Sequence, residues 1–250
     1  MPYAPLDLSA VDRLPLLSRV EDGRTLPMLL WVPGQSRRMI SSAPLGGGIG
    51  ERHWVLNAQV AHGYRRTDPD VHLAALAAGA GASGPGVGLM TAASVADHGR
   101  ASDGGVWALA SAGLGVRGWA ADPAPGVPGP RSAGTINIVV SVPVAFSDAA
   151  LVNAVATATE AKVQALRDAG VDASGTPTDA VCVAAPHPAA GRPGEPFAGP
   201  RSVWGARLAR AVHEATYHAC LRSRGPERPL ALERPLAPGG TSGPGGVSGG

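Results

Sequence analysis

The sequence predicts a single-domain mixed α/β fold, of the α+β kind, in which layered mixed sheets pack against helices. Three observations lead to this fold class. Apolar strand-like runs surround two segments with clear helical periodicity, and strands and helices do not alternate strictly along the chain. The chain has 35 Gly but only 5 Trp, 3 Tyr and 2 Phe, which favours a core of closely packed small side chains. Its 250 residues suffice for one large domain.

Three segments are expected along the chain. Residues 1–24 are expected to form an N-terminal extension that contains one short amphipathic stretch, from Leu6 to Leu17. Residues 25–222 are expected to form the folded domain. Residues 223–250 consist mainly of Pro, Gly, Ser and a few charged side chains. Such a composition buries too little apolar surface to offset the entropy of ordering, so this tail is expected to be disordered.

The first strands of the domain flank a glycine-rich loop. Residues 27–32 and 38–43 are expected to form a hairpin around Pro33 and Gly34. A loop with three consecutive glycines, over residues 44–51, then leads into a strand over residues 53–60. The helix that follows is expected to begin at Asp68 and Pro69, as N-cap and first helical residue, and to end at Gly79 or Gly81.

The second half of the domain predicts further strands and the two clearest helices. A helix over 148–169 is expected to be capped by Ser147 or Asp148 and stopped by Gly170. A final helix is expected from about residue 202 to 222, with one apolar face. The remaining apolar runs, which predict strands, cover residues 87–94, 105–112, 135–144 and 178–185.

Charge and cysteine content exclude several classes of protein. A net charge of +2 without a Lys/Arg-rich run argues against nucleic-acid binding and against an anionic membrane surface. Cys182 and Cys220 are 38 positions apart, which fits neither a disulfide framework nor a zinc site. Neither an export signal nor 18 consecutive apolar residues is present. We therefore expect a cytoplasmic protein, with no protein-bound metal.

One lysine is singled out by its position on the 148–169 helix. Twenty of the 21 basic residues are Arg, and Lys162 is the single Lys. At about 100° per residue, one apolar face is predicted, with Thr159 and Lys162 within roughly 45° of its centre. The residues that define this face are Leu151, Val152, Val155, Val163 and Leu166. Burying an ammonium costs several kcal/mol unless it is paired, so Lys162 either has a partner or function inside, or extends along the helix edge to water.

The glycine loop and its flanks carry neutral hydrogen-bonding groups. Consecutive glycines permit positive φ and close backbone approach, so that free N–H groups can face a ligand; a plain hairpin turn is the alternative. The residues expected to contact a ligand here are Ser41, Ser42, Gly46, Gly47, Gly48, His53 and Asn57.

Two more polar segments open predicted strands. Thr135 and Asn137 begin one strand, and Thr176, Thr178 and Asp179 precede another. With Thr91 at the end of an apolar run, they could bring hydroxyl, amide and carboxylate groups to one rim of a sheet. The alternative is that they are ordinary turn formers and caps.

An ordered set of segments resembles the adenosylcobinamide amidohydrolase family. The likeness spans roughly residues 25–222 and is specific in the order and separation of its segments rather than in any one motif. The segments are SSAPLGGGIGERHWVLNAQV (41–60), VGLMTAAS (87–94), GTINIVV (134–140), ATATEAKVQAL (156–166) and SGTPTDAVCVA (174–184). Ser174 stands where the family pattern has Thr, and the segment around Arg117 is more basic and glycine-rich than is usual.

The resemblance implies hydrolysis of an amide on the corrin rim of adenosylcobinamide, giving adenosylcobyric acid and aminopropanol. Cobalt would arrive within the substrate, so we expect no cofactor, and the partner is a small corrinoid, with a homo-oligomer compatible with the sequence. For such chemistry we expect Asp179 or His53 as base, and Lys162 as oxyanion stabiliser or proton donor. Asn57, Asn137 and glycine-loop amides would position the substrate. Thr159, Glu160, Thr176 and Thr178 complete the expected substrate contacts.

Direct attack by water is favoured, with Thr135 as the alternative covalent nucleophile. Three other functions stay open at this point. One is a corrinoid-binding protein without catalysis. The second is an amidase or acyltransferase that uses a strand-initial threonine, and the third is a structural domain whose polar loops are turns.

Overall fold

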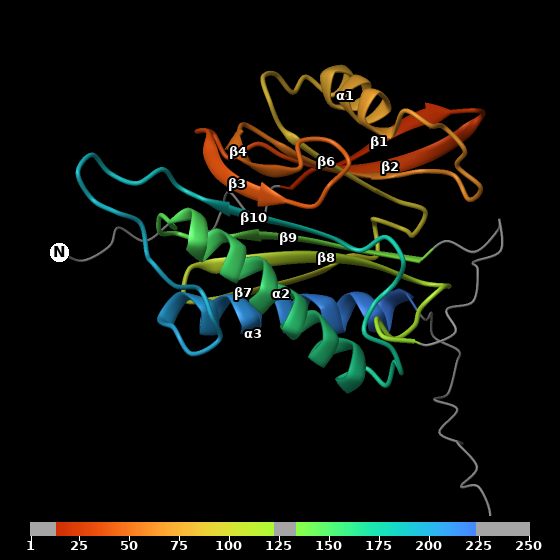
Figure 1. Cartoon of the computed structure of the whole chain (residues 1–250). Helices are drawn as coiled ribbons and strands as arrows, with labels where there is room; N and C mark the ends of the chain where they lie inside the picture. Colours follow the sequence, from red (N-terminus) through yellow and green to blue (C-terminus); the bar gives the residue numbers. More distant parts are fainter. Residues whose placement is uncertain (1–13, 123–133, 224–250) are drawn as a thin grey trace, which may run out of the picture.

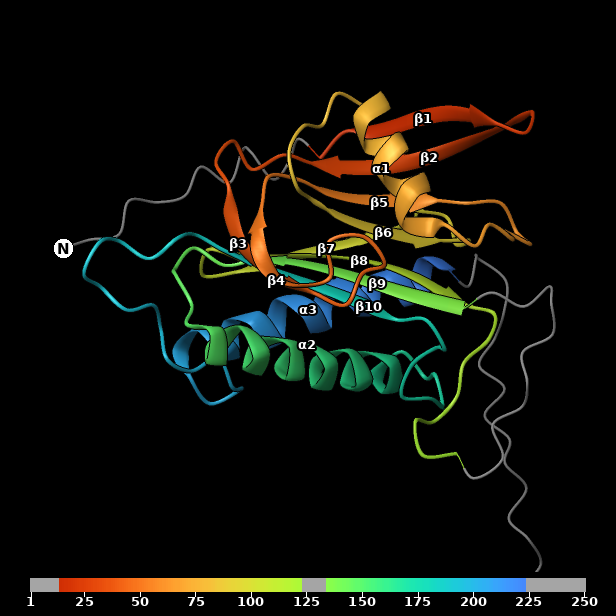
Figure 2. The ribbon, with the colours of Figure 1, turned by 45° about the horizontal axis from the view of Figure 1, so that its top comes forward.

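The computed structural model describes residues 14–122 and 134–223 and consists of four layers. One helix covers the outer face of a four-stranded sheet, and two helices cover the outer face of a six-stranded sheet (Figure 1). The inner faces of the two sheets lie against each other, as the tilted view also shows (Figure 2). The predicted mixed α/β class, with layered mixed sheets, is therefore confirmed.

The four-stranded sheet has the order β1-β2-β5-β6. β1, β2 and β5 pair antiparallel, whereas β5 and β6 are parallel and are joined through α1, which makes a βαβ unit. The elements are β1 (Leu16–Glu21), β2 (Arg24–Trp31), β5 (Val55–Gln59), α1 (Pro69–Gly79) and β6 (Val87–Thr91).

The six-stranded sheet has the order β4-β3-β10-β9-β8-β7. β9 and β10 are its parallel pair and are joined through α2, which makes a second βαβ unit, while α3 packs on β7 and β8. The elements are β3 (Arg37–Ser41), β4 (Gly48–Arg52), β7 (Gly99–Asp103), β8 (Val106–Leu114), β9 (Gly134–Ser141), α2 (Asp148–Asp168), β10 (Ala180–Ala185) and α3 (Val203–Ser223).

Apolar side chains fill the space between the two sheets. Trp31 of β2 meets Trp107 of β8 edge to face, with ring centroids 4.8 Å apart and planes at 86°. Leu29 and Leu109, both 2% exposed, belong to the same cluster. Aromatic pairs in this geometry contribute about 0.5–1.5 kcal/mol beyond area burial, so this contact helps to set the separation of the sheets.

The predicted hairpin between residues 27–32 and 38–43 is wrong. β2 pairs with β1 and β5 in one sheet, and β3 pairs with β4 and β10 in the other. The chain crosses between layers at Pro33 and Gly34 rather than reversing within one sheet. The glycine loop instead makes the β3–β4 hairpin, with Ser41 opposite Gly48.

The two ends of the predicted domain differ in how far the structure tests them. β1 lies within the segment expected to be an N-terminal extension, so part of residues 1–24 belongs to the sheet. Most of the stretch from Leu6 to Leu17 lies outside the described residues. So does the predicted disordered tail, except for Ser223 at the end of α3.

Helix α2 begins and ends close to its predicted limits but buries a different face. The Ser147 hydroxyl accepts a hydrogen bond from the Ala150 N–H at 3.1 Å, as an N-cap does. The buried face consists largely of alanines, together with Leu151, Leu166 and Lys162, whereas Val152 is exposed. Small side chains let the helix lie close to β10 and α3. None of the helices in the described part of the chain is long and apolar enough to cross a membrane.

Candidate active site

A cleft of about 660 Å³ opens where the two βαβ units meet. Its walls come from the carboxyl ends of β5 and β6, from the segment after β3, and from the amino ends of β9 and β10. Loops at strand ends on a rigid sheet are the usual setting for a binding site. The cleft residues are Ser42, Pro44, Val60, Ala61, Gly63, Tyr64, Pro69, Met90, Thr91, Ala92, Gly134, Thr135, Asn137, Pro177, Thr178, Asp179 and Ala180.

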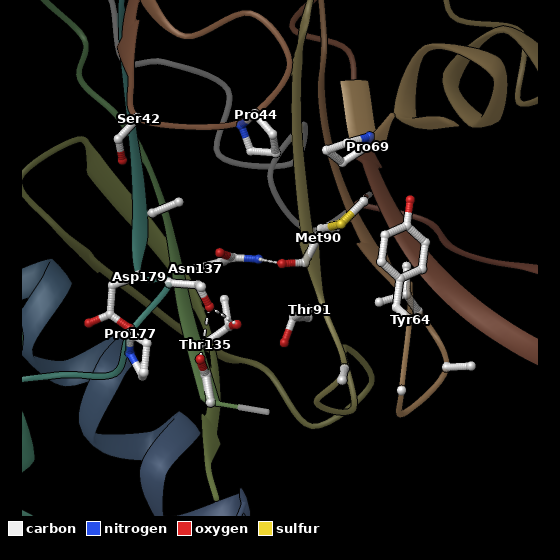
Figure 3. Close-up of a pocket in the computed structure, with 17 residues that line it drawn as sticks. Ser42, Pro44, Tyr64, Pro69, Met90, Thr91, Thr135, Asn137, Pro177 and Asp179 are labelled. Atoms are coloured by element: carbon white, nitrogen blue, oxygen red, sulfur yellow. Dashed lines mark hydrogen bonds between the residues drawn. The ribbon is translucent and has the colours of Figure 1, made fainter. Parts of the chain in front are cut away.

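One wall of the cleft gathers polar side chains from the ends of β3, β9 and β10, and Thr91 of β6 faces them from the opposite wall (Figure 3). Each of these residues was a site candidate from sequence, and the fold brings them to one cavity because β9 and β10 are parallel neighbours whose first residues lie side by side. The members of this wall are Ser42, Thr135, Asn137, Thr178 and Asp179, called here the polar wall.

Behind the polar wall, a buried hydrogen-bonded network connects the two sheets. The amide nitrogen of Asn137 donates to Asn57 Oδ1 at 2.8 Å and to the Met90 carbonyl at 3.0 Å. Asn57 in turn donates to the Ser111 hydroxyl at 2.9 Å. The Met90 carbonyl can only accept, so the orientation of the Asn137 amide is fixed. Its Oδ1 atom is buried without a donor among the described residues, which costs about 1–3 kcal/mol until a donor reaches it.

Lys162 is buried at 7% exposure and pairs with Asp179. Its Nζ lies 2.5 Å from Asp179 Oδ2, so the ammonium does not extend to water. The same carboxylate accepts hydrogen bonds from the Ile136 N–H at 3.0 Å, the Thr176 N–H at 3.2 Å and the Thr176 hydroxyl. Because a carboxylate has about four acceptor positions, Asp179 is saturated.

A glycine makes room for this ion pair. A Cβ on Gly175 would collide with Asp179 Oδ2 and would lie 2.7 Å from Lys162 Nζ. The Gly175 backbone is held by the segment after β8, since its carbonyl accepts from the Gly118 N–H at 3.1 Å. The Lys162–Asp179 pair therefore requires a residue without a side chain at position 175.

Two threonine hydroxyls share a hydrogen bond at the start of β9. Thr135 Oγ1 and Thr178 Oγ1 lie 2.6 Å apart, and Thr178 Oγ1 lies 2.9 Å from the Gly134 carbonyl. That carbonyl only accepts, so Thr178 donates to it and Thr135 donates to Thr178. The hydrogen-bond partner of Thr135 is thus a hydroxyl and not a base, which gives no activation of Thr135 as a nucleophile.

Several sequence candidates lie away from the cleft. His53 is exposed beyond the end of β4, and its backbone N–H donates to the Pro85 carbonyl at 2.8 Å. Thr159 and Glu160 are exposed on α2, and the Thr159 hydroxyl donates to the Val155 carbonyl one turn earlier. The expectation that Thr159 faces inward with Lys162 is therefore wrong, because the buried face of α2 is centred on its alanines.

The glycine loop packs against backbone rather than against the cleft. Gly46, with φ +71°, would carry a Cβ that collides with the Gly86 carbonyl, and it borders a separate hollow beside Trp54. Gly47 and Gly48 complete the β3–β4 turn and are exposed. Ser41 is buried, and its hydroxyl donates to the Val181 carbonyl at 3.0 Å, which ties β3 to β10.

Apart from Thr91, the second wall of the cleft was not predicted. Tyr64 lines it from the loop before α1, and its hydroxyl lies 2.9 Å from Nδ1 of the buried His72. Nε2 of His72 lies 3.4 Å from Glu21 Oε1. Burial lowers the pKa of His72 and raises the pKa of Tyr64. The three residues come from β1, a loop and α1, so no local sequence pattern connects them.

The buried thiol of Cys182 is not expected to react near neutral pH. Cys182 is fully buried in β10, and burial raises its pKa to about 12. A thiol with so high a pKa is not a nucleophile near neutral pH. Among the described residues, no three His, Cys, Asp or Glu side chains gather as a metal-binding group.

The family comparison agrees with the resemblance seen in the sequence. A family model described as adenosylcobinamide amidohydrolase matches residues 13–227, which cover β1 through α3 and both walls of the cleft. No curated protein matches the chain. The family description names a hydrolase of an amide bond. With the match extending over most of its 250 residues, the chain belongs to the adenosylcobinamide amidohydrolase family.

Proposed function

We propose that this protein hydrolyses the amide that joins aminopropanol to the corrin rim of adenosylcobinamide. Water adds to the carbonyl carbon, the C–N bond breaks, and the products are adenosylcobyric acid and aminopropanol. Family membership supports the reaction class. Cobalt belongs to the substrate in this proposal, so the chemistry of the amide falls to the side chains of the cleft.

The observation that carries the proposal is the uncharged character of the polar wall. Its hydrogen-bonding groups are hydroxyls and the Asn137 amide, and the charge of its one carboxylate, Asp179, is neutralised by the buried Lys162 behind it. A corrinoid is a largely apolar macrocycle fringed by neutral amides, which such groups recognise without a charge to desolvate. A cavity of about 660 Å³ takes one edge of the macrocycle and its amide arms rather than the whole molecule.

Two hydroxyls of the cleft can donate to the substrate. Ser42 Oγ accepts the Val181 N–H at 3.1 Å, and Thr91 Oγ1 accepts the Ala93 N–H at 3.0 Å. With an acceptor position filled from the backbone, each hydroxyl keeps its proton for another acceptor. We assign Thr91 to the carbonyl oxygen, where a donor is worth most as negative charge develops. Ser42, at the other end of the cleft (Figure 3), is assigned to another amide of the corrin rim.

Asn137 and the ion pair have complementary roles in this proposal. Asn137 Oδ1, which has no hydrogen-bond donor among the described residues, accepts an N–H of a substrate amide once the atoms that bury it move aside. Asp179 is saturated and therefore serves as a positioning group rather than as the base, and Lys162 holds it in place. The positive charge of Lys162 offsets the carboxylate that would otherwise oppose an oxyanion.

The test is direct detection of both products. Purified protein is incubated with adenosylcobinamide, and aminopropanol and the corrinoid acid are followed by mass spectrometry over time. Equal molar release of both is expected. Corrinoid binding without either product would replace the enzyme by a carrier protein. A second gel band from cleavage before Thr135 would favour the threonine-nucleophile class instead.

A further inference from the structure

The second wall of the cleft holds an aromatic hydroxyl backed by a buried imidazole. Figure 3 shows Tyr64 across the cleft from Asn137 and Thr135, with its ring at the wall and its hydroxyl directed toward the α1 side. The hydroxyl oxygen lies 2.9 Å from Nδ1 of His72, and the two ring planes differ by 9°. His72 is 5% exposed, so its contact with the cleft passes through Tyr64.

A carboxylate lies on the far side of His72. Glu21 Oε1 lies 3.4 Å from His72 Nε2, while Glu21 Oε2 accepts from Arg19 at 3.0 and 2.7 Å. Arg19 also donates to the Gln59 carbonyl at 2.9 Å, which anchors it to β5. A carboxylate only accepts, so Nε2 of the neutral imidazole carries its proton and Nδ1 accepts from the Tyr64 hydroxyl.

This arrangement supplies what the polar wall lacks. Attack by water on an amide needs a base near the carbonyl. Asp179 is saturated by four donors, and His53 lies outside the cleft. The Tyr64 hydroxyl and the Glu21 carboxylate lie at different ring nitrogens of His72. In catalytic sites of this kind, the imidazole is the base and the carboxylate orients it.

We infer that Tyr64 is a catalytic residue that passes a proton from the attacking water to His72 and later returns it to the leaving amine. This inference rests on the proposed function and deepens it. The water donates to the Tyr64 oxygen from within the cleft, because the proton of Tyr64 is directed to His72. Thr91 donates to the carbonyl oxygen, and the polar wall lies on the other side of the substrate amide (Figure 3).

Atoms and charge balance over the cycle. As the water oxygen bonds to the carbonyl carbon, one water proton moves to Tyr64 Oη and the Tyr64 proton moves to His72 Nδ1, giving an imidazolium paired with Glu21. The tetrahedral oxyanion then reforms the carbonyl and the C–N bond breaks. The imidazolium returns a proton through Tyr64 to the departing nitrogen, and the acid and the free amine leave.

The charged groups around His72 come from several elements. Glu21 and Arg19 face it from β1, and Arg66 and Asp68 approach it from the loop before α1, in addition to Tyr64. Burial is the largest influence and lowers the pKa of His72, so the imidazole is neutral and able to accept near pH 7. Turnover should therefore fall as pH drops through the titration of His72.

The experiment compares Tyr64→Phe and His72→Gln with the wild-type protein on adenosylcobinamide. Tyr64→Phe keeps the ring but removes the relay, and kcat should fall about 100-fold or more with KM nearly unchanged. His72→Gln retains an acceptor for the Tyr64 hydroxyl but does not titrate, so it should be slow and should lack the acid limb of the pH profile. Matched controls are Tyr217→Phe and His213→Gln, an aromatic pair of α3 outside the cleft-lining set.

The outcomes separate this inference from the proposed function. Unfolding midpoints establish that the variants are folded, and if Tyr64→Phe is not, His72→Gln carries the test. A structural tyrosine would change the midpoint without changing kcat, so wild-type kcat and pH profile in the folded variants would overturn the relay. Release of no aminopropanol by the wild type would remove the proposed function, and the relay with it.

Discussion

Replacing Lys162 by Met should separate the stabilising role of the Lys162–Asp179 pair from its role in turnover. Lys162 and Asp179 side chains are 9% and 13% exposed, so little solvent screens them. Removing one member of a buried pair costs about 3–5 kcal/mol. The Asp179 carboxylate keeps the Ile136 N–H and both Thr176 donors, which places the loss near the lower end, at about 3 kcal/mol.

For a chain of this size that loss lowers Tm by about 6–12 °C. Urea unfolding of Lys162→Met, Asp179→Asn and the double variant gives the pairwise energy, which should be about 2 kcal/mol. Turnover of Lys162→Met should be nearly abolished below its melting temperature, because Asp179 is then mispositioned and uncompensated at the cleft. A coupling energy near zero, or normal aminopropanol release by the folded variant, would refute the reasoning.

The other predictions concern the room around the ion pair and the titration of His72. Gly175→Ala should destabilise the protein by about 1–3 kcal/mol and lower turnover, since its Cβ would displace Lys162 and Asp179. Gly118→Ala is the matched control, because Gly118 pairs with Gly175 and has open space at its Cβ position; equal effects in urea unfolding would contradict the steric argument. Burial lowers the pKa of His72, so the unfolded chain takes up a proton that the folded one resists. The free energy of unfolding should therefore fall from about pH 7.5 to about pH 5.5. His72→Gln should flatten this dependence, and an unchanged slope in urea titrations would count against the neutral buried imidazole.

The sequence predicted those parts of the fold whose signal is local. α2 was located from its Ser147 cap and its apolar spacing, and most strands were found as apolar runs. The sheet to which a strand belongs is a long-range property, which explains the wrong hairpin between residues 27–32 and 38–43. The linker at Pro33 and Gly34 has the composition of a turn, but only the packing of the two sheets decides that it crosses between layers.

The candidate site was predictable on one wall and, apart from Thr91, not on the other. Thr135, Asn137 and Asp179 stand near the starts of β9 and β10, and neighbouring parallel strands bring such positions together. The buried Lys162 was found because an ammonium on an apolar helix face needs a partner. Tyr64 and His72 gave no comparable signal, since their alignment with Glu21 depends on how β1 and α1 meet in space.

The two βαβ units explain why the cleft has a titratable group behind each wall. In the β5-α1-β6 unit, the crossover helix places His72 behind Tyr64, and in the β9-α2-β10 unit it places Lys162 behind Asp179. Each helix packs on the outer face of its own sheet, so each residue reaches the cleft only through a partner at a strand end or loop. The distance between the walls is then set by sheet-to-sheet packing, including the Trp31–Trp107 contact, rather than by the helices. We therefore expect changes in the inter-sheet core to alter the width of the cleft, and changes at His72 or Lys162 to alter the charge of the groups that line it.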